Sequence, residues 1–180
     1  MLVDRTRELD RLLPVQSRRQ RKAPFRIVVS YAHNDAKFMQ QLQMHLQILH
    51  HQGLIEYWSE RRIVPGQEWD TEVRRQIDSS DFIIVLVSTA FLASGYIHNV
   101  EMAAAMERHQ KGQATVVPII LESCSWQSES WSTLNVLPEN GKPVRHFSPQ
   151  RAAWTNVEEG LRKLIGKDAA RRSTERGGYR

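Results

Sequence analysis

Apolar positions follow two alternating patterns along this chain. Short runs of mostly apolar residues, many of them β-branched, occur at FRIVVS (25–30), LIEYW (54–58), FIIVLVS (82–88) and ATVVPIIL (114–121). Runs of this length are typical of buried strands. Between the runs, apolar residues recur every three or four positions, which is the period of one face of a helix. The pattern therefore predicts strands that alternate with amphipathic helices.

The helical segments follow the strands in order. The first, about 35–51, places Phe38 and Leu42 on one face, and Asn34 or Asp35 is positioned to cap it. Further helices are predicted in WDTEVRRQID, in the alanine-rich stretch that ends near Gly112, and in PQRAAWTNVEEGLRKLIG (149–166).

Strands that alternate with helices form a parallel sheet covered on both faces. With a further short strand expected near KPVRHF (142–147), the predicted fold class is α/β, a flavodoxin-like doubly wound parallel sheet of about five strands. Ligands bind beyond the carboxyl ends of the strands in such sheets. A functional site is therefore expected among 30–35, 58–67, 88–101 and the loop that follows Leu121.

Basic residues are concentrated at the two ends of the chain. The 180 residues have a net charge of +5, yet 1–25 holds seven Lys/Arg against three Asp/Glu, and 162–180 holds seven against two. The centre is therefore mildly acidic. This contrast suggests a basic N-terminal helix or linker at 1–24, one domain at 25–166, and a basic C-terminal tail or linker at 167–180.

These basic ends are interpreted as connectors. SRRQRK (17–22) and RRSTERGGYR (171–180) carry charges that nucleic acid attracts. They lack the repeated aromatic residues on which single-stranded bases stack. Direct nucleic-acid binding is therefore not expected, and a contact of these runs with nucleic acid is kept as the alternative.

Several familiar chemistries are missing from the sequence. It contains no GxxxxGK[ST], no GxGxxG, no GxSxG and no HExxH motif. Cys124 is the only cysteine, which excludes an internal disulfide. No apolar run approaches the ~20 residues that cross a bilayer. We therefore expect no metal, no membrane contact and a cytoplasmic location.

Longer motifs occur in a fixed order between residues 25 and 166. They are FRIVVSYAHND, then YWSERRIVPGQEWDTEV, then SSDFIIVLVSTAFLASGYIHNVEMAAAMERH, then VVPIIL followed by SW, and last LPENGKPV before the final helix. In this order and spacing they resemble a bacterial Toll/interleukin receptor (TIR) domain. The second motif is similar to the family's BB loop, and the third to the strand and helix that carry its glutamate.

The resemblance implies one of two functions. Many animal TIR domains are scaffolds that assemble through the BB loop, whereas many bacterial and plant members cleave NAD+ at its nicotinamide–ribose bond. The family's catalytic glutamate falls on Glu101. The implied activity is an NAD+ nucleosidase that yields nicotinamide plus ADP-ribose or a cyclic ADP-ribose, without a cofactor, as an effector of bacterial antiviral defence. A non-catalytic scaffold is the alternative.

The resemblance and the strand ends together suggest contacts to the substrate. The expected NAD+ contacts are Ser30, Tyr31, Trp58, Arg61 and Tyr96. Packing at a strand end is the alternative interpretation for Ser30 and Tyr31, and core packing for Trp58. The plainest interpretation of Glu101 is a solvated carboxylate near a helix N-terminus, and that of Arg108 is a surface ion pair.

Self-association is the second implied property. In this family the NAD+ pocket is completed by the BB loop of a neighbouring protomer, so activity follows assembly. The corresponding residues are Arg62, Ile63, Val64, Pro65, Gly66 and Gln67. Arg61 and Arg62 suit either the pyrophosphate of NAD+ or the neighbouring subunit. A fused or associated sensor domain is a further implied partner.

Overall fold

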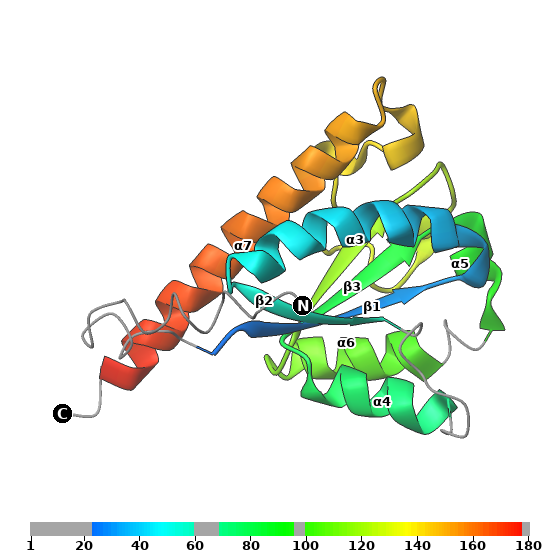
Figure 1. The fold of residues 1–180 in the computed structure, drawn as a ribbon. Coiled ribbons are helices and arrows are strands. Elements are labelled where there is room, and N and C mark those ends of the chain that lie inside the picture. Colours follow the sequence, from blue (N-terminus) through cyan, green and yellow to red (C-terminus); the bar gives the residue numbers. More distant parts are fainter. Residues whose placement is uncertain (1–22, 60–68, 96–99, 178–180) are drawn as a thin grey trace, which may run out of the picture.

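A four-stranded parallel sheet forms the centre of the computed structural model, which describes residues 23–59, 69–95 and 100–177. The strands lie in the order β2-β1-β3-β4 (Figure 1). They are β1 (Phe25–Tyr31), β2 (Ile55–Ser59), β3 (Phe82–Val87) and β4 (Thr115–Ile120). The α-helices are α3 (Ala36–His51), α4 (Trp69–Ser79), α5 (Thr89–Ala93), α6 (Met102–Gln110) and α7 (Arg151–Gly177). Short 3-10 helices are η1 (His33–Asp35), η4 (Trp126–Ser128), η5 (Glu139–Gly141) and η6 (Val144–His146).

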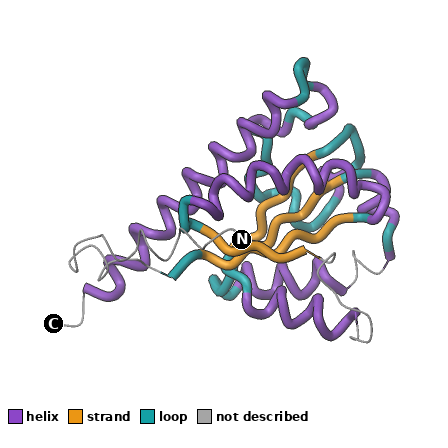
Figure 2. The backbone as a smooth tube through the Cα atoms, viewed as in Figure 1, coloured by secondary structure: helices purple, strands orange, loops and turns teal. Residues whose placement is uncertain are grey.

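Helices cover both faces of the sheet, as the alternating pattern predicted. Figures 1 and 2 show α3 and α7 on one face and α4 and α6 on the other. Side chains alternate along β1, so Ile27 and Val29 join the α3/α7 core while Val28 joins the α4/α6 core. The predicted α/β doubly wound parallel fold is confirmed.

Two element boundaries differ from the prediction. The sheet has four strands among the described residues rather than about five, because the segment near KPVRHF forms η6 instead of a strand. Pro143 precedes η6 and has no N–H for a strand ladder. The last helix also continues past residue 166 to Gly177.

The outer edge of β4 is closed to a further strand. Leu137 makes the only bridge there among the described residues, accepting from Ile120 N–H at 2.8 Å and donating to Pro118 O at 2.8 Å. Pro118 lacks an N–H, and Val116 N–H donates to His109 Nδ1 at 3.2 Å. The outward N–H positions from Val116 to Ile120 are therefore bonded or absent.

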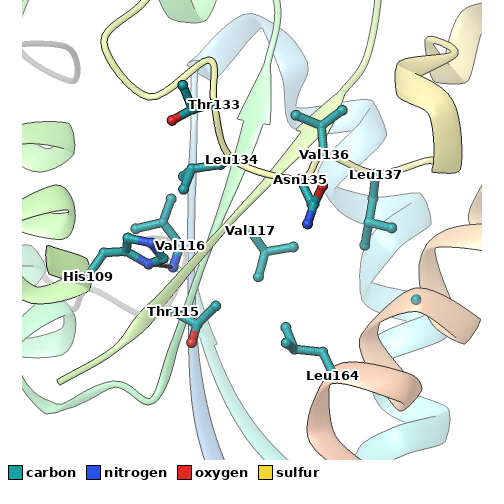
Figure 3. Close-up of a pocket in the computed structure, with 11 residues that line it drawn as sticks. His109, Thr115, Val116, Val117, Thr133, Leu134, Asn135, Val136, Leu137 and Leu164 are labelled. Atoms are coloured by element: carbon teal, nitrogen blue, oxygen red, sulfur yellow. Dashed lines mark hydrogen bonds between the residues drawn. The ribbon is translucent and has the colours of Figure 1, made fainter. Parts of the chain in front are cut away.

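An apolar groove lies beside this edge. Its volume is about 380 Å³, and Figure 3 shows Val117, Leu137 and Leu164 around it. His109 is the only side chain lining it that can carry a charge. At Gly160 an added Cβ would come within 2.5 Å of Leu137 Cδ2, so a larger residue there would require the Leu137 side chain to shift.

Asp81 joins the amino ends of several elements. Its carboxylate accepts from Arg26 N–H at 2.7 Å, and its backbone O accepts from Thr115 N–H at 2.8 Å. Arg172 of α7 donates to the Asp81 carboxylate, and its guanidinium lies 4.1 Å from the centre of the Phe25 ring. The distal part of α7 is thereby held at the amino edge of the sheet.

Polar contacts connect α3 to α7 around Glu158. His45 Nδ1 lies 2.8 Å from Glu158 Oε2, and Arg162 donates to Glu158 Oε1 at 3.0 Å. Burial raises the pKa of Glu158, but the hydrogen bonds from His45 and Arg162 outweigh burial and hold this pKa below its usual value. The ionised carboxylate therefore stabilises the folded state.

We expect Glu158→Gln to lower the free energy of unfolding by about 1 kcal/mol near neutral pH, because the amide cannot form the ion pair with Arg162. The folded-state pKa lies below the ordinary 4.5. The stabilisation is therefore complete above that pH and is lost as the pH falls through the folded-state value. Urea unfolding near pH 7 and near pH 3 measures both limits. Glu159→Gln, which changes an exposed neighbour, is the control. Equal losses in the two variants would contradict the expectation.

Candidate functional site

Glu101 is a buried carboxylate at the carboxyl edge of the sheet. It immediately precedes α6, has helical dihedral angles, and makes no side-chain capping bond to that helix. Only 2% of the residue is exposed. This burial contradicts the plainest sequence interpretation, a solvated carboxylate on a helix surface. Because Glu101 makes no capping bond to α6, its own helix does not explain why the side chain is buried. A contact from another element is needed to explain it.

That contact comes from β1. Ser30 Oγ donates to Glu101 Oε2 at 2.6 Å, across 71 residues of sequence, and both side chains are buried. Ser30 lies beside Val85 of β3 in the ladder. Because Val28 faces the α4/α6 core and side chains alternate along a strand, Ser30 faces the same side. This distance lies at the short end of the range for O–H···O hydrogen bonds.

The other predicted NAD+ contacts are placed differently. Trp58 is half-buried and packs against the α4/α6 core, on the same face as Ser30 and Glu101. Tyr31 is buried in the α3/α7 core, on the opposite face. Arg61, Tyr96 and the BB-loop residues 62–67 lie outside the described residues. The structure therefore brings together Ser30 and Glu101, with Trp58 on their face, and does not bring Tyr31 to them.

A second polar pair at the same edge was not expected from the sequence. Asp35, one of the two residues predicted to cap α3, occupies its N-cap position but makes no capping bond, so this alternative is wrong. Its carboxylate instead accepts from Ser88 Oγ at 2.5 Å. Ser88 Oγ also accepts from Phe91 N–H at 3.0 Å and so caps α5.

Glu122 and Arg145 extend this pair. Glu122 Oε1 accepts from Thr89 N–H at 3.1 Å, and its Oε2 lies 3.1 Å from Arg145 Nε. Burial raises the pKa of Asp35, opposed by the Ser88 hydrogen bond; nearby Glu122 raises it further and Arg145 lowers it. The net shift is upward. The start of α5 is thus held by two carboxylates from two different loops.

One signal in the sequence points to this network. Ser88 is the last residue of a predicted strand, and Asp35 and Glu122 each follow a predicted strand within a few residues. The carboxyl ends of parallel strands lie at one edge of the sheet, so polar residues after them are brought together. Because α5 leads through residues 96–99 to Glu101, the network fixes the described start of the segment that carries the glutamate.

Arg108 has a structural contact in place of the expected surface ion pair. Its guanidinium donates to Ile77 O and, at 2.9 Å, to Ser80 O, both at the C-terminal end of α4. Cations at a helix C-terminus satisfy carbonyls that have no partner within the helix. Arg108 therefore connects the end of α6 to the end of α4.

Metal and membrane features are absent from the described part of the chain. In residues 23–59, 69–95 and 100–177, no group of three or more His, Cys, Asp or Glu side chains could hold a metal ion. Over the same ranges, no helix is both long enough and apolar enough to span a membrane.

Comparison with known proteins supplies the family. The family model described as TIR domain matches residues 27–164. The chain belongs to the TIR domain family. The TIR domain of the Toll-related receptor TRR-2 from Hydra magnipapillata has a similar structure, with a TM-score of 0.50 and 17% identity over 76% of this chain and 97% of that one. At this identity the likeness concerns the fold alone.

Two further relatives were found. The TIR domains of the activated Roq1 resistosome, which directly recognizes the pathogen effector XopQ, align with a TM-score of 0.49 and 17% identity over 79% of this chain and 84% of that one. The uncharacterized protein y4lF of Sinorhizobium fredii is 38% identical over 141 residues, which cover 78% of this chain and 44% of that protein. The chain thus spans less than half the length of this curated relative.

The anchoring of α5 can be tested at Ser88. We expect Ser88→Ala to lower the free energy of unfolding by about 2 kcal/mol, because it removes the α5 cap and the hydroxyl that donates to buried Asp35. Urea denaturation measures this loss. Ser125→Ala is the matched control, since Ser125 is exposed and occupies the N-cap of η4 without a capping bond. A loss no larger than that of the control would contradict the anchoring role.

Proposed function

We propose that this TIR domain is an NAD+ nucleosidase in which Glu101 is the catalytic carboxylate. The observation that carries the proposal is the position of Glu101, 2% exposed at the carboxyl edge of the sheet and bonded to Ser30 of β1. Ligand sites of doubly wound sheets lie at this edge. The products are nicotinamide and either ADP-ribose or a cyclic ADP-ribose, and NAD+ is a substrate, so no cofactor is needed.

The burial of Glu101 supports a functional role. Removing a carboxylate from water costs several kcal/mol unless hydrogen bonds or charges compensate. A glutamate that served only the solubility of α6 would face solvent, as Glu107 does on the same helix with 66% of its side chain exposed. A buried acidic group in a ligand-binding position is a typical feature of an active site.

One carboxylate is chemically sufficient for this reaction. Cleavage of an N-glycosidic bond passes through a ribose with oxocarbenium character, as in glycoside hydrolysis. Nicotinamide leaves NAD+ as a neutral molecule from a cationic group, so the leaving group needs no general acid. Glu101 accepts hydrogen bonds from the ribose hydroxyls and stabilises the positive charge that develops on the sugar.

The remaining substrate contacts are part of the same proposal. Trp58, on the face of Glu101, stacks on a ring of NAD+. Arg61 and Tyr96 border the pyrophosphate and the ribose. The BB loop, Arg62–Gln67, completes the pocket of a neighbouring copy, so that activity follows assembly. We further propose a cytoplasmic effector of bacterial antiviral defence, controlled by a fused or associated sensor domain.

A non-catalytic scaffold is the alternative function. One observation favours it: Met44 and Ile48, one turn apart on α3, are 62% and 44% exposed. Exposed apolar side chains at this spacing are suited to contact a partner. A scaffold would use such surfaces without needing the carboxylate of Glu101, so the two functions differ in what a change at this residue does.

The catalytic role is tested by Glu101→Gln. We expect this variant to lose nicotinamide release by at least about a hundredfold, because the amide cannot stabilise a developing positive charge. Release is followed by chromatography on concentrated full-length protein with NAD+. Glu107→Gln removes the same charge from an exposed position of α6 and should leave the rate unchanged.

Equal folding of both variants is checked by urea unfolding. Unchanged activity in a folded Glu101→Gln variant would overturn the catalytic assignment. Absence of nicotinamide release by the wild type, even when copies are forced together by fusion to an oligomeric partner, would favour the scaffold.

Assembly is tested at the BB loop. We expect Pro65→Asp or Gly66→Pro to lower NAD+ cleavage while leaving the unfolding transition unchanged, because the loop is proposed to act on the neighbouring copy. Activity per molecule is measured against protein concentration, with light scattering to determine the size of the particles. Full activity in a verified monomer would contradict this requirement for assembly.

A further inference from the structure

The hydroxyl of Ser30 has a role of its own in this site. We propose that Ser30 is a positioning residue that fixes the orientation of the Glu101 carboxylate, in place of the direct NAD+ contact expected from the sequence. The catalytic consequence of this inference rests on the proposed function, whereas the orientation itself does not. The contact that carries it is the 2.6 Å hydrogen bond from Ser30 Oγ to Glu101 Oε2.

The geometry of the pair suits this role. Ser30 has a single hydroxyl proton, and it is donated to Glu101. The residue is 5% exposed, so bulk water has little access to replace the bond. A carboxylate offers about four acceptor positions, and the serine takes one of them at Oε2. The same carboxylate can thus accept from the serine and from a ribose hydroxyl at once.

The two residues differ in the rigidity of their surroundings. β1 is an inner strand with a neighbour on each side. Val29 pairs with a residue of β2, and Ser30 pairs with a residue of β3. Glu101 has a longer side chain with three rotatable bonds and stands before the first turn of α6. A donor on a rigid strand therefore selects one rotamer of a flexible acid. Positioning of this kind contributes to catalysis because small displacements of a reacting group lower the rate.

A matched serine lies between α4 and β3. Ser80 is 4% exposed, and its Oγ donates to Gln76 O at 2.6 Å. The burial is close to that of Ser30 and the bond length is the same, but Ser80 lies just before β3, at the amino edge of the sheet, and its acceptor is a helix carbonyl. Loss of the Ser80 hydroxyl therefore reproduces the general cost of removing a buried hydroxyl without affecting Glu101.

The first readout is independent of activity. In full-length protein labelled with 13C at the glutamate carboxyls, the Glu101 resonance is identified by its loss in Glu101→Gln. We expect Ser30→Ala to shift this resonance and Ser80→Ala to leave it in place. Ser30→Thr, which keeps a hydroxyl and suits a strand, should retain the wild-type position. An unmoved Glu101 resonance in folded Ser30→Ala would overturn the proposal.

The second readout separates positioning from substrate binding. We expect Ser30→Ala to lower kcat for NAD+ cleavage about tenfold or more with little change in KM, since the bond orients the acid rather than the substrate. Ser30→Thr should recover most of kcat, and Ser80→Ala should match the wild type. A raised KM with unchanged kcat would overturn the positioning role in favour of direct NAD+ contact.

The two measurements distinguish failure of the proposed role of Ser30 from failure of the proposed NAD+ cleavage. If the Glu101 resonance moves in Ser30→Ala while the assembled wild-type protein releases no nicotinamide, the orientation of Glu101 by Ser30 is supported and the proposed function is lost. If the wild type cleaves NAD+ and the resonance, kcat and KM all stay unchanged in Ser30→Ala, the proposed function is supported and the role of Ser30 is overturned.

Discussion

A carboxylate can be kept away from water only if other groups replace its hydration. Glu101 meets this condition through a strand that lies 71 residues earlier in the sequence, and the hydrogen bond from Ser30 is the visible part of the compensation. The bond exists only when β1, β3 and the start of α6 are all in place. The position of the acid is therefore a property of the assembled sheet rather than of its own helix.

The parallel arrangement of the strands explains why polar residues gather at one edge. Loops that follow β1, β3 and β4 meet there, and they supply Asp35, Ser88 and Glu122 to one network. This network lies at the start of α5, whereas Ser30 and Glu101 lie on the α4/α6 face. The Ser30–Glu101 pair holds the buried acid, and the Ser88–Asp35 pair anchors the start of α5, the helix that precedes Glu101 in the chain. The same edge of the sheet therefore contains the acid and the contacts that anchor the segment before it.

Much of this arrangement could be predicted from the sequence, because apolar periodicity reports burial directly. The runs at 82–88 and 114–121 became β3 and β4, and the motif around Glu101 placed the acid at the correct edge. The hydrogen-bond partners of individual side chains were harder to predict, since a hydrogen bond across 71 residues leaves no local pattern in the sequence. Asp35 looked like a helix cap but bonds Ser88. The expected fifth strand did not form: the segment forms η6, and Pro143 before it has no N–H for a strand ladder.

The closed edge of β4 has a consequence for how copies of this domain can associate. Strand addition needs free backbone donors, and between Val116 and Ile120 the outward positions are bonded to His109 or Leu137 or, at Pro118, have none to offer. Association on this side must therefore rely on side chains and loops rather than on a continuous backbone ladder. Contacts of that kind are reversible and respond to salt and to single substitutions, whereas an extended ladder would tend toward permanent fibres.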